Sequence, residues 1–494
     1  MREIQCRLLV IGAGPGGYVC AIRAGQLGVD TVIVDSAPPG GTCLNVGCIP
    51  SKALIHAAEE FHRITALSTA PAMGISATAP VLDLAATVAW KDGIVSRLTG
   101  GVAGLLRKAK VRLVAGQASI RDGKTAVVDT PEGPVQIRAE VLVIATGSEP
   151  VELPGLAFGG KVISSTGALA LTEVPGRLAV VGGGYIGLEL GIAFAKLGAA
   201  VTVVEAGPRI LPQYDAELTR PVAQRLADLG VRVLTGARAG GLSDSGALRV
   251  AGADGAEDIA ADKVLVTVGR RPRATGAGLD GLRLEMAGPF LRIDAHCRTS
   301  MTGVYAIGDV TGEPMLAHRA MAQGEMVAEI VAGQRRLWDK RAIPAVCFTE
   351  PEIVSVGLSP DEAKVQGQQV ITGTFPFGAN GRAMTAADES GFIRVTARAD
   401  THEVLGIQAV GAGVAEMAGG FALALEMGAR IEDITGTIHA HPTRGEALHE
   451  ACLRALGRQT RPPGSYEVLL VGGEPGAAEA LPLACPLRRN AAPR

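Results

Sequence analysis

The chain has 494 residues, of which 47% are apolar and 19% are charged. At roughly 100–200 residues per domain this length predicts two to four domains. The high apolar content and the net charge of −2 exclude a mainly disordered chain, and they argue against a nucleic-acid-binding protein, which would need a basic face.

The chain begins with a strand–turn–helix–strand pattern. Apolar residues 7–11 predict a buried strand, and residues 31–35 predict a second strand that ends in Asp35. Between them stand three glycines in the spacing G-x-G-x-x-G, namely Gly12, Gly14 and Gly17. These glycines allow a tight turn and the close approach of a pyrophosphate to a helix N-terminus, and the acid can bind ribose hydroxyls. We see no secretory signal before the first strand and therefore expect a cytoplasmic protein.

Two cysteines lie close together in the segment 40–52. On a regular helix, residues five apart are separated along the axis by about 7.5 Å, and a disulfide cannot join Cα atoms further apart than about 7 Å. A disulfide between Cys43 and Cys48 therefore requires a distorted turn, which Gly47 and Pro50 allow. Such a bond would be labile and redox-active. The alternative is a zinc half-site, but we find no second Cys or His pair at ligand spacing and expect no metal.

The first pattern recurs at residues 178–205, with glycines Gly182, Gly184 and Gly187 and a final Glu205. In both copies the acid follows the first glycine by 23 residues. One such glycine pattern is weak evidence, whereas two with the same spacing predict two dinucleotide-binding units. The apolar stretch 178–195 contains Glu189, so we predict a buried strand and helix there and not a membrane span.

Each unit ends in a buried strand that runs into a glycine, at residues 141–147 and 264–269. A later strand at residues 303–307 leads into Gly308 and Asp309, which indicates that the second unit is inserted into the first domain. Because Asp309 follows a strand C-terminus, it is well placed to bind a ribityl or phosphate group of a cofactor.

The composition changes after Arg341. Four apolar stretches predict an antiparallel sheet, at residues 345–348, 353–356, 392–396 and 404–409, and helices are predicted at 413–427 and 443–456. We expect a separate α+β domain there, followed by a mostly flexible Pro/Gly/Ala-rich tail at residues 459–494.

Over about residues 5–458 the chain resembles the flavin-dependent pyridine nucleotide-disulfide oxidoreductases. The motifs that carry the resemblance are GTCLNVGCIPSK at 41–52, the two glycine turns, Gly308-Asp309, MLAH at 315–318 and HAHPTxxE at 439–446. It implies an α/β fold with two Rossmann-like dinucleotide-binding domains, for FAD and NAD, and a C-terminal α+β dimerisation domain. The expected limits are 1–148 for FAD and the cysteine pair, 149–270 for NAD, 271–341 for the continuation of the FAD domain, and 342–458 for dimerisation.

The resemblance also implies a reaction. The chain would reoxidise protein-bound dihydrolipoamide to lipoamide through its cysteine pair and FAD, and reduce NAD, as a component of a 2-oxo acid dehydrogenase complex. The amino-acid sequence of the chain most resembles those of family members that serve branched-chain 2-oxo acid dehydrogenase complexes. The expected partners are a second copy in a homodimer and the lipoyl and subunit-binding domains of an acyltransferase, with no nucleic acid or membrane.

The implied catalytic residues fall into three pairs. Cys43 would exchange with the dithiol while Cys48 faces the flavin. Lys52 and Glu189 would pair near the flavin and nicotinamide, since a buried lysine needs a partner to stay charged. His441, oriented by Glu446 and delivered across the dimer interface, would take a thiol proton, for which the pKa of imidazole is suited.

The expected cofactor-binding residues are Gly12, Gly14, Gly17, Asp35, Thr42, Cys43, Lys52, Gly116, Thr146, Gly147, Asp309, Met315, Leu316, Ala317, His318, Gly182, Gly183, Gly184, Tyr185, Ile186, Gly187, Glu189, Glu205 and Gly269. Glu205 favours NAD over NADP, because a carboxylate binds a free 2′-hydroxyl but repels a 2′-phosphate. The chain departs from the family pattern at Asp35, where Glu is usual, and at Arg444 and Gly445, where Leu and Ser are common.

Two other functions are compatible with parts of this pattern. A sister reductase could act on another disulfide, but those of the mercuric and large thioredoxin type use a second cysteine pair near the C-terminus, where this chain has only Cys485. The chain could instead be a flavoprotein retained as a tethering subunit, which the intact cysteine and histidine–glutamate pairs argue against.

Overall fold

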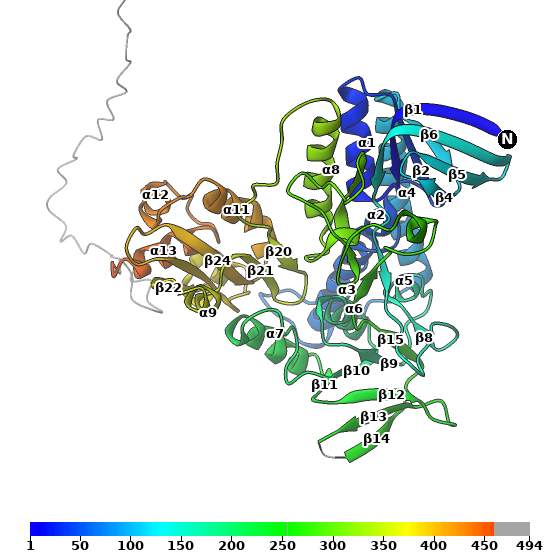
Figure 1. Ribbon diagram of the computed structural model, residues 1–494. Helices are drawn as coiled ribbons and strands as arrows, with labels where there is room; N and C mark the ends of the chain where they lie inside the picture. The colour runs from blue at the N-terminus through cyan, green and yellow to red at the C-terminus, as the bar shows by residue number, and fades with distance from the viewer. Residues whose placement is uncertain (254, 459–494) are drawn as a thin grey trace, which may run out of the picture.

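The computed structural model describes residues 1–253 and 255–458, which are built around three main sheets (Figure 1). The predicted tail, residues 459–494, lies outside the described residues. Within the described part of the chain, no helix has both the length and the apolar character needed to cross a membrane.

The first sheet has seven strands in the order β3-β2-β1-β6-β5-β4, with β19 added beside β6. Its strands are β1 (Arg2–Ile11), β2 (Thr31–Asp35), β3 (Arg112–Ala115), β4 (Gln117–Asp122), β5 (Thr125–Thr130), β6 (Gly133–Ile144) and β19 (Val304–Ala306). The strands β1, β2, β3, β6 and β19 pair in parallel, so their C-terminal ends share one edge of the sheet. The chain leaves this sheet after β6 and returns to it at β19.

Helices cover one face of the first sheet. They are α1 (Pro15–Gln26), α4 (Leu84–Lys108) and α8 (Ala317–Val331). Successive residues of β1 point to opposite faces, as a strand requires: Leu8 and Val10 pack in the core with these helices, and Leu9 and Ile11 pack in the core on the other face. The helices α2 (Gly41–Val46) and α3 (Cys48–Thr69) follow β2 and lead toward the second sheet.

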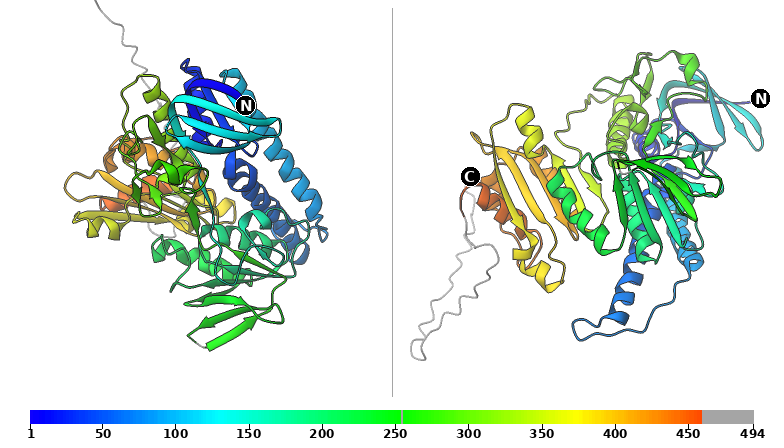
Figure 2. Two further views of the ribbon diagram at one scale, coloured as in Figure 1. Left: turned by 45° about the vertical axis from the view of Figure 1, so that its right-hand side comes forward. Right: turned by 90° about the horizontal axis from the view of Figure 1, so that it is seen from below.

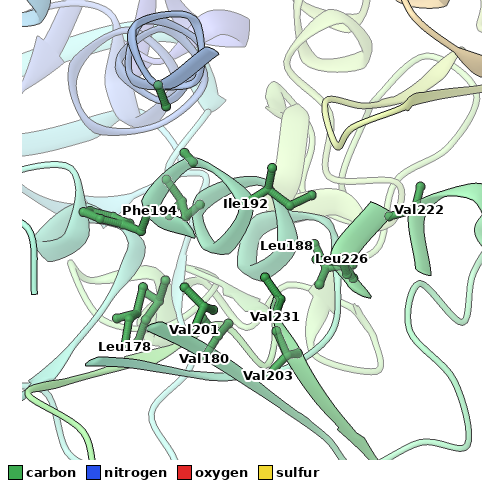
Figure 3. Close-up of a cluster of buried hydrophobic side chains, with 14 of the residues drawn as sticks. Leu178, Val180, Leu188, Ile192, Phe194, Val201, Val203, Val222, Leu226 and Val231 are labelled. Carbon is green, nitrogen blue, oxygen red and sulfur yellow. The ribbon is translucent and has the colours of Figure 1, made fainter. Parts of the chain in front are cut away.

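The second sheet is parallel, in the order β11-β10-β9-β15-β8. Its strands are β8 (Val162–Ile163), β9 (Arg177–Val181), β10 (Ala200–Glu205), β11 (Arg232–Thr235) and β15 (Lys263–Val266), and its helices are α5 (Ser165–Ala168), α6 (Tyr185–Lys196) and α7 (Ala216–Asp228). In Figure 3, α6 lies over strand residues such as Val180 and Val203, and its Leu188 lies beside Leu226 of α7. The antiparallel strands β12 (Arg238–Leu242), β13 (Leu248–Gly252) and β14 (Gly255–Ile259) form a further small sheet.

The third sheet is antiparallel, as predicted, in the order β20-β21-β24-β23-β22. Its strands are β20 (Ala345–Cys347), β21 (Glu352–Gly357), β22 (Val370–Pro376), β23 (Phe392–Arg398) and β24 (Val404–Gly411). Its helices are α9 (Pro360–Val365), α10 (Gly381–Thr385), α11 (Ala418–Glu426), α12 (Ile431–Gly436) and α13 (Glu446–Ala455). The remaining short strands are β7 (Ser148–Pro150), β16 (Arg270–Pro272), β17 (Met286–Ala287) and β18 (Phe290–Leu291).

The predicted α/β fold class and the α+β character of the C-terminal region are confirmed. Two helix predictions were wrong at their limits: the helix predicted from residue 413 is a 3-10 turn, Val414–Met417, followed by α11, and the helix predicted from residue 443 begins at Glu446. The strand β22 was not predicted. The domain limits stay predictions.

Candidate functional site

The first glycine turn connects β1 to α1 at the C-terminal edge of the first sheet. Its outer glycines are required by contacts within the protein, since a Cβ at Gly17 would lie 1.8 Å from the Gly12 carbonyl oxygen. The middle glycine is different, because a Cβ at Gly14 would have only the Gly41 Cα within 4 Å, at 3.8 Å. Gly14 therefore borders open space at a helix N-terminus, which is where a dinucleotide pyrophosphate binds.

The second turn, between β9 and α6, repeats this arrangement. A Cβ at Gly187 would lie 2.3 Å from the Gly182 carbonyl oxygen, whereas one at Gly184 would meet no atom within 4 Å. Both turns thus combine tight packing at the outer glycines with free space at the middle one. The residues present fit two dinucleotides.

The acid that ends each second strand holds its turn through both carboxylate oxygens. The donors are the amides of Ala13 and Ala37 for Asp35, at 2.6 and 2.9 Å, and those of Gly183 and Gly207 for Glu205, both at 2.6 Å. Each oxygen keeps a second lone pair with which it can accept from a ribose hydroxyl. The sequence pattern indicated the ribose role but not this bracing of the turn.

The other residues predicted to bind a cofactor gather along the edge of the first sheet. The Gly116 amide donates to the Asp35 carbonyl at 2.9 Å. Thr146 and Gly147 directly follow β6, and Asp309 follows the neighbouring parallel strand β19. Exposed Thr42 lies on α2. Met315 and Leu316 directly precede α8, which begins at Ala317, and the His318 ring in its first turn bonds the Pro344 carbonyl at 2.8 Å.

Two residues that the sequence analysis missed fix Asp309. The Ser148 hydroxyl donates to Asp309 Oδ2 at 2.5 Å, and the same hydroxyl accepts from Arg270 Nε at 2.8 Å. Arg270 also donates to the Ser148 carbonyl at 2.8 Å. Both residues come directly after a predicted terminal glycine, Gly147 or Gly269, and that position was the available signal.

The cysteine pair lies where the two helices α2 and α3 meet. Gly47, with φ −140° and ψ −109°, breaks the helix, so that α3 begins at Cys48. This is the distorted turn that a bridge between the cysteines requires, and both are thiols in this structure. A hydrogen bond from the Cys43 thiol, helped by the Lys52 charge and opposed by burial, lowers the pKa of Cys48 to about 7. The same bond, together with burial, raises the pKa of Cys43.

Lys52 and Glu189 form an ion pair beside the cysteines. Lys52 Nζ lies 2.7 Å from Glu189 Oε2, and the Glu189 side chain is only 4% exposed. Glu189 Oε1 accepts from the Phe348 amide at 2.9 Å, while Lys52 Nζ lies 4.4 Å from the centroid of the Phe348 ring. The carboxylate inside the apolar stretch is thus fully partnered, and helices from two sheets meet at this point.

A cleft of about 720 Å³ runs along the second glycine turn, a size suited to a dinucleotide. Of the predicted cofactor-binding residues, those lining it are Gly182, Gly184, Tyr185, Ile186, Glu205, Gly269, Met315 and Leu316. Tyr214, Arg238 and Val346 line it as well and were not predicted. Burial raises the pKa of the Tyr185 phenol, so this ring stays neutral in the cleft.

His441 and Glu446 form a hydrogen-bonded pair in the C-terminal region. His441 Nδ1 lies 2.9 Å from Glu446 Oε1, and the other carboxylate oxygen accepts from the Thr443 amide at 2.9 Å. The His441 side chain is 63% exposed, whereas that of Glu446 is 16% exposed. With Nδ1 bound to the carboxylate, Nε2 is the nitrogen that can accept a proton from a thiol.

Within one chain, the structure does not bring this pair to the cysteines. In Figures 1 and 2, α13 lies on the side of the third sheet that faces away from α2 and α3. The predicted catalytic residues therefore form two separate groups: Cys43, Cys48, Lys52 and Glu189 in one, and His441 and Glu446 in the other.

Comparisons with known proteins agree with this geometry. Residues 6–324 match the family model "Pyridine nucleotide-disulphide oxidoreductase", and residues 343–452 match the dimerisation domain of the same family. Among solved structures, LpdA from Mycobacterium tuberculosis superposes with a TM-score of 0.84 at 27% identity, covering 91% of this chain and 99% of that one. The flavoprotein disulfide reductase RclA from Escherichia coli superposes with a TM-score of 0.80 at 25% identity, covering 90% and 99%.

Sequence relatives extend over nearly the whole length. A dihydrolipoyl dehydrogenase of Pseudomonas aeruginosa is 59% identical over 455 residues, which cover 92% of this chain and 98% of the relative. Dihydrolipoyl dehydrogenase 2 of Haloarcula marismortui is 46% identical, covering 91% and 96%, and the enzyme of Geobacillus stearothermophilus is 44% identical, covering 92% and 97%. The two dinucleotide turns, the paired cysteines and these relatives all lead to one conclusion. The chain belongs to the pyridine nucleotide-disulphide oxidoreductase family.

Proposed function

We propose that this chain catalyses the dihydrolipoyl dehydrogenase reaction, in which protein-bound dihydrolipoamide is reoxidised and NAD is reduced. The observation that supports this most strongly is the 59% identity, over 92% of the chain, to a relative that carries that name. The chain also keeps the chemical groups that the reaction needs: two adjacent thiols, a charged pair beside them and a histidine–carboxylate pair.

FAD would be held by the first glycine turn, with Asp35 toward its ribose and Asp309 toward its ribityl or phosphate groups, and NAD by the second turn and the cleft beside it. When bound, FAD carries the electron pair from the cysteines to NAD. Glu205 would select NAD, because its carboxylate repels a 2′-phosphate. The nearby Arg209 is held in its own loop, where its guanidinium donates to the carbonyls of Leu211 and Pro212 at 3.3 and 2.8 Å.

The first step is proton removal from the substrate. His441, held by Glu446, takes a proton from one thiol of dihydrolipoamide, because the thiolate is the nucleophile in disulfide exchange. That thiolate attacks Cys43 Sγ in the Cys43–Cys48 disulfide and forms a mixed disulfide. The bond between the two cysteines breaks, and Cys48 leaves as a thiolate.

Lys52 favours this step, because its charge lowers the pKa of Cys48 even while Cys43 is held in the mixed disulfide, and a thiol of lower pKa is a better leaving group. The second substrate thiol then attacks the mixed disulfide, which closes lipoamide and releases Cys43. The released Cys43 takes the proton of this second thiol and donates it in a hydrogen bond to the Cys48 thiolate. The pair has gained two electrons, and Lys52 stabilises the resulting negative charge.

The site would be completed in a homodimer. The chain carries a dimerisation domain, and the His441–Glu446 pair lies away from the cysteines of its own chain. The same region exposes large apolar side chains, among them Leu423 at 62%, Met427 at 75% and Ile438 at 96%. Ile438 stands three residues before His441. A second subunit that covers Ile438 would therefore place its cysteines close to His441 of the first subunit.

Within a 2-oxo acid dehydrogenase complex, the partners would be the lipoyl domain of an acyltransferase, which carries the dithiol, and its subunit-binding domain. That the complex is of the branched-chain type stays a prediction from the sequence.

The decisive experiment measures reduction of NAD and of NADP by the purified protein with dihydrolipoamide as the donor. We expect turnover with NAD and a kcat/KM for NADP lower by at least about a hundredfold, the loss expected when a charged contact turns repulsive. No turnover with dihydrolipoamide, together with oxidation of NADH by another disulfide, would move the function to a sister reductase.

A further inference from the structure

Helices α3 and α6 are joined by two ion pairs, not one. The first is Lys52–Glu189 at the redox site, and the second joins Glu59 to Lys196. On each helix the two charged residues are seven apart, which is two turns, so they lie on one face about 10.5 Å apart along the axis. The order of charges is reversed: α3 supplies the cation in the first pair and the anion in the second.

In both pairs α6 supplies the more buried charge. The side chains of Glu189 and Lys196 are 4% and 3% exposed, whereas their α3 partners Lys52 and Glu59 are 33% and 44% exposed. A buried charge needs a partner in a fixed place, because an unpaired one is strongly destabilising. Each buried residue on α6 therefore restricts where α3 can lie.

The segment before β21 contacts both pairs. Phe348 bonds Glu189 through its amide, and Glu350 pairs with Lys196. Glu350 also accepts from Arg225 Nε of α7 at 2.9 Å, and the Arg225 guanidinium lies 3.4 Å from the ring of His62, the other titratable group of α3 at this cluster. The second pair is thus the centre of a charged cluster that joins α3, α6, α7 and the third sheet.

The backbone and the apolar packing do not fix the position of α3 by themselves. Gly47 breaks the helix directly before Cys48, so α2 does not hold α3 in line. Between the two ion pairs, α3 buries Leu54 and small residues such as Ala58 against the core that α6 shares, and Ile55 packs there partly buried. Apolar surfaces tolerate small shifts, whereas charged contacts specify register.

We infer that the Glu59–Lys196 ion pair is a positioning contact, which fixes the register of α3 against α6 and so holds Lys52 against Glu189 beside Cys48. Neither residue touches the cysteines or a cofactor turn, and both act through the first pair. This contact acts on the redox site itself, whichever dithiol is the substrate.

The state of the Cys48 thiol reports on this contact, and the sign of its change separates positioning from simple electrostatics. Glu189 raises the pKa of Cys48 and Lys52 lowers it. If α3 shifts and the first pair opens, Glu189 is further away and Lys52 is less neutralised, so the pKa of Cys48 falls. Direct loss of the Lys196 cation, with no shift of α3, would change it in the opposite direction, because removing a cation disfavours the thiolate.

The experiment measures the pH dependence of alkylation at Cys48 in the holoenzyme with reduced cysteines, using iodoacetamide and fragment-resolved mass spectrometry. The wild type should show a midpoint at about 7. We expect Lys196→Met to lower it by at least about half a unit, and Lys196→Arg, which keeps the charge, to leave it at the wild-type value. Glu59→Gln should lower it as well, but loss of this anion also favours the thiolate directly, so its effect is compared with and without Glu189→Gln. In a Glu189→Gln background, Lys196→Met should cause no further change, since the two act through one contact.

Arg394→Met is the matched control. Arg394 is also a buried cation between regions, paired with Asp215 and Glu217 at the start of α7, but it does not contact α3. In Arg394→Met the midpoint of Cys48 alkylation should equal that of the wild type, even if thermal unfolding shows that this variant loses as much stability as Lys196→Met. A raised or unchanged midpoint in Lys196→Met, or a further shift in the Glu189→Gln background, would overturn the inference. If Lys196→Met fails to fold, Glu59→Gln in the Glu189→Gln background tests the contact, because a direct charge effect would persist there and a positioning effect would not.

Discussion

At the scale of single residues, the two cysteines differ in their chemistry although they are neighbours. Cys43 keeps its proton and donates it to Cys48, and Lys52 adds a positive charge near the resulting thiolate. The difference follows mainly from the direction of the hydrogen bond between the two thiols, and residue spacing alone gave no sign of it. What spacing did predict was the need for a distorted turn, which the break at Gly47 supplies.

We expect Cys48→Ser to retain FAD and lose dithiol turnover by at least about a thousandfold, because the hydroxyl cannot form the disulfide that accepts the electrons. The measurement is the flavin absorbance of the purified variant beside NAD reduction with dihydrolipoamide. Cys6→Ser is the control, since the Cys6 thiol is buried in the core of the first sheet, where it donates to the Arg138 carbonyl at 3.7 Å, and its loss should leave turnover unchanged. Full turnover in Cys48→Ser would refute the assigned role.

For His441→Gln we expect the dithiol half-reaction to slow by about 10²–10⁴-fold, the usual contribution of a general base. Flavin reduction by NADH should change little, because this side chain does not lie in the nucleotide cleft. Stopped-flow absorbance measures the two halves separately. His402→Gln removes a second His–Glu pair of the same region, with Glu432 at 2.5 Å, and should leave both rates at the wild-type value. Equal slowing of both halves in His441→Gln would contradict its role as the base.

At the scale of helices and strands, the repeated glycine spacing was the most informative part of the sequence. It predicted both strand–turn–helix units, because close packing against the backbone excludes any side chain at the outer glycines and so fixes their spacing. The strand β22 escaped prediction because Gly373 and two threonines interrupt its apolar pattern. A Cβ at Gly373 would lie 2.0 Å from the Ala451 carbonyl of α13, so close packing by this helix excludes any larger residue there.

The two kinds of glycine should respond differently to one added methyl group. In Gly184→Ala the fold has room for the new Cβ, and we expect FAD content and thermal stability near the wild type but a KM for NAD at least about tenfold higher, since the pyrophosphate can no longer approach. Gly187→Ala should instead lose thermal stability, because its Cβ would collide with the Gly182 carbonyl. Steady-state kinetics and thermal unfolding measure the two effects. Equal KM values for Gly184→Ala and the wild type would contradict the placement of NAD.

At the scale of the whole molecule, the sequence predicted two dinucleotide-binding units followed by an antiparallel sheet, but not the antiparallel strands β4 and β5 or the small sheet of β12, β13 and β14. It could not place the regions relative to one another, because contacts such as Ser148–Asp309 and Lys196–Glu350 join residues that are far apart in the chain and carry no shared pattern. The sequence pattern likewise does not reveal that His441 lies away from the cysteines of its own chain. Only the family resemblance had suggested that a second subunit completes the site.

This arrangement predicts complementation between inactive subunits. Cys48→Ser and His441→Gln subunits, when unfolded together and reassembled in equal amounts, should recover about one quarter of wild-type turnover, because half of the dimers are mixed and each of these has one intact site. Each variant refolded alone measures the background. Recovery no greater than this background, in samples whose mixed dimers are verified by mass, would place the base and the cysteines in the same chain.

The double role of Glu205 limits how the coenzyme preference of this fold can evolve. Replacing the carboxylate with a cation would suit a 2′-phosphate, yet it would also remove the two bonds at 2.6 Å that tie the strand end to Gly183 and Gly207. A lineage that passes from NAD to NADP must therefore first acquire another brace for this turn, or tolerate a less stable intermediate. The same coupling explains why an engineered switch at this position alone would trade selectivity against folding.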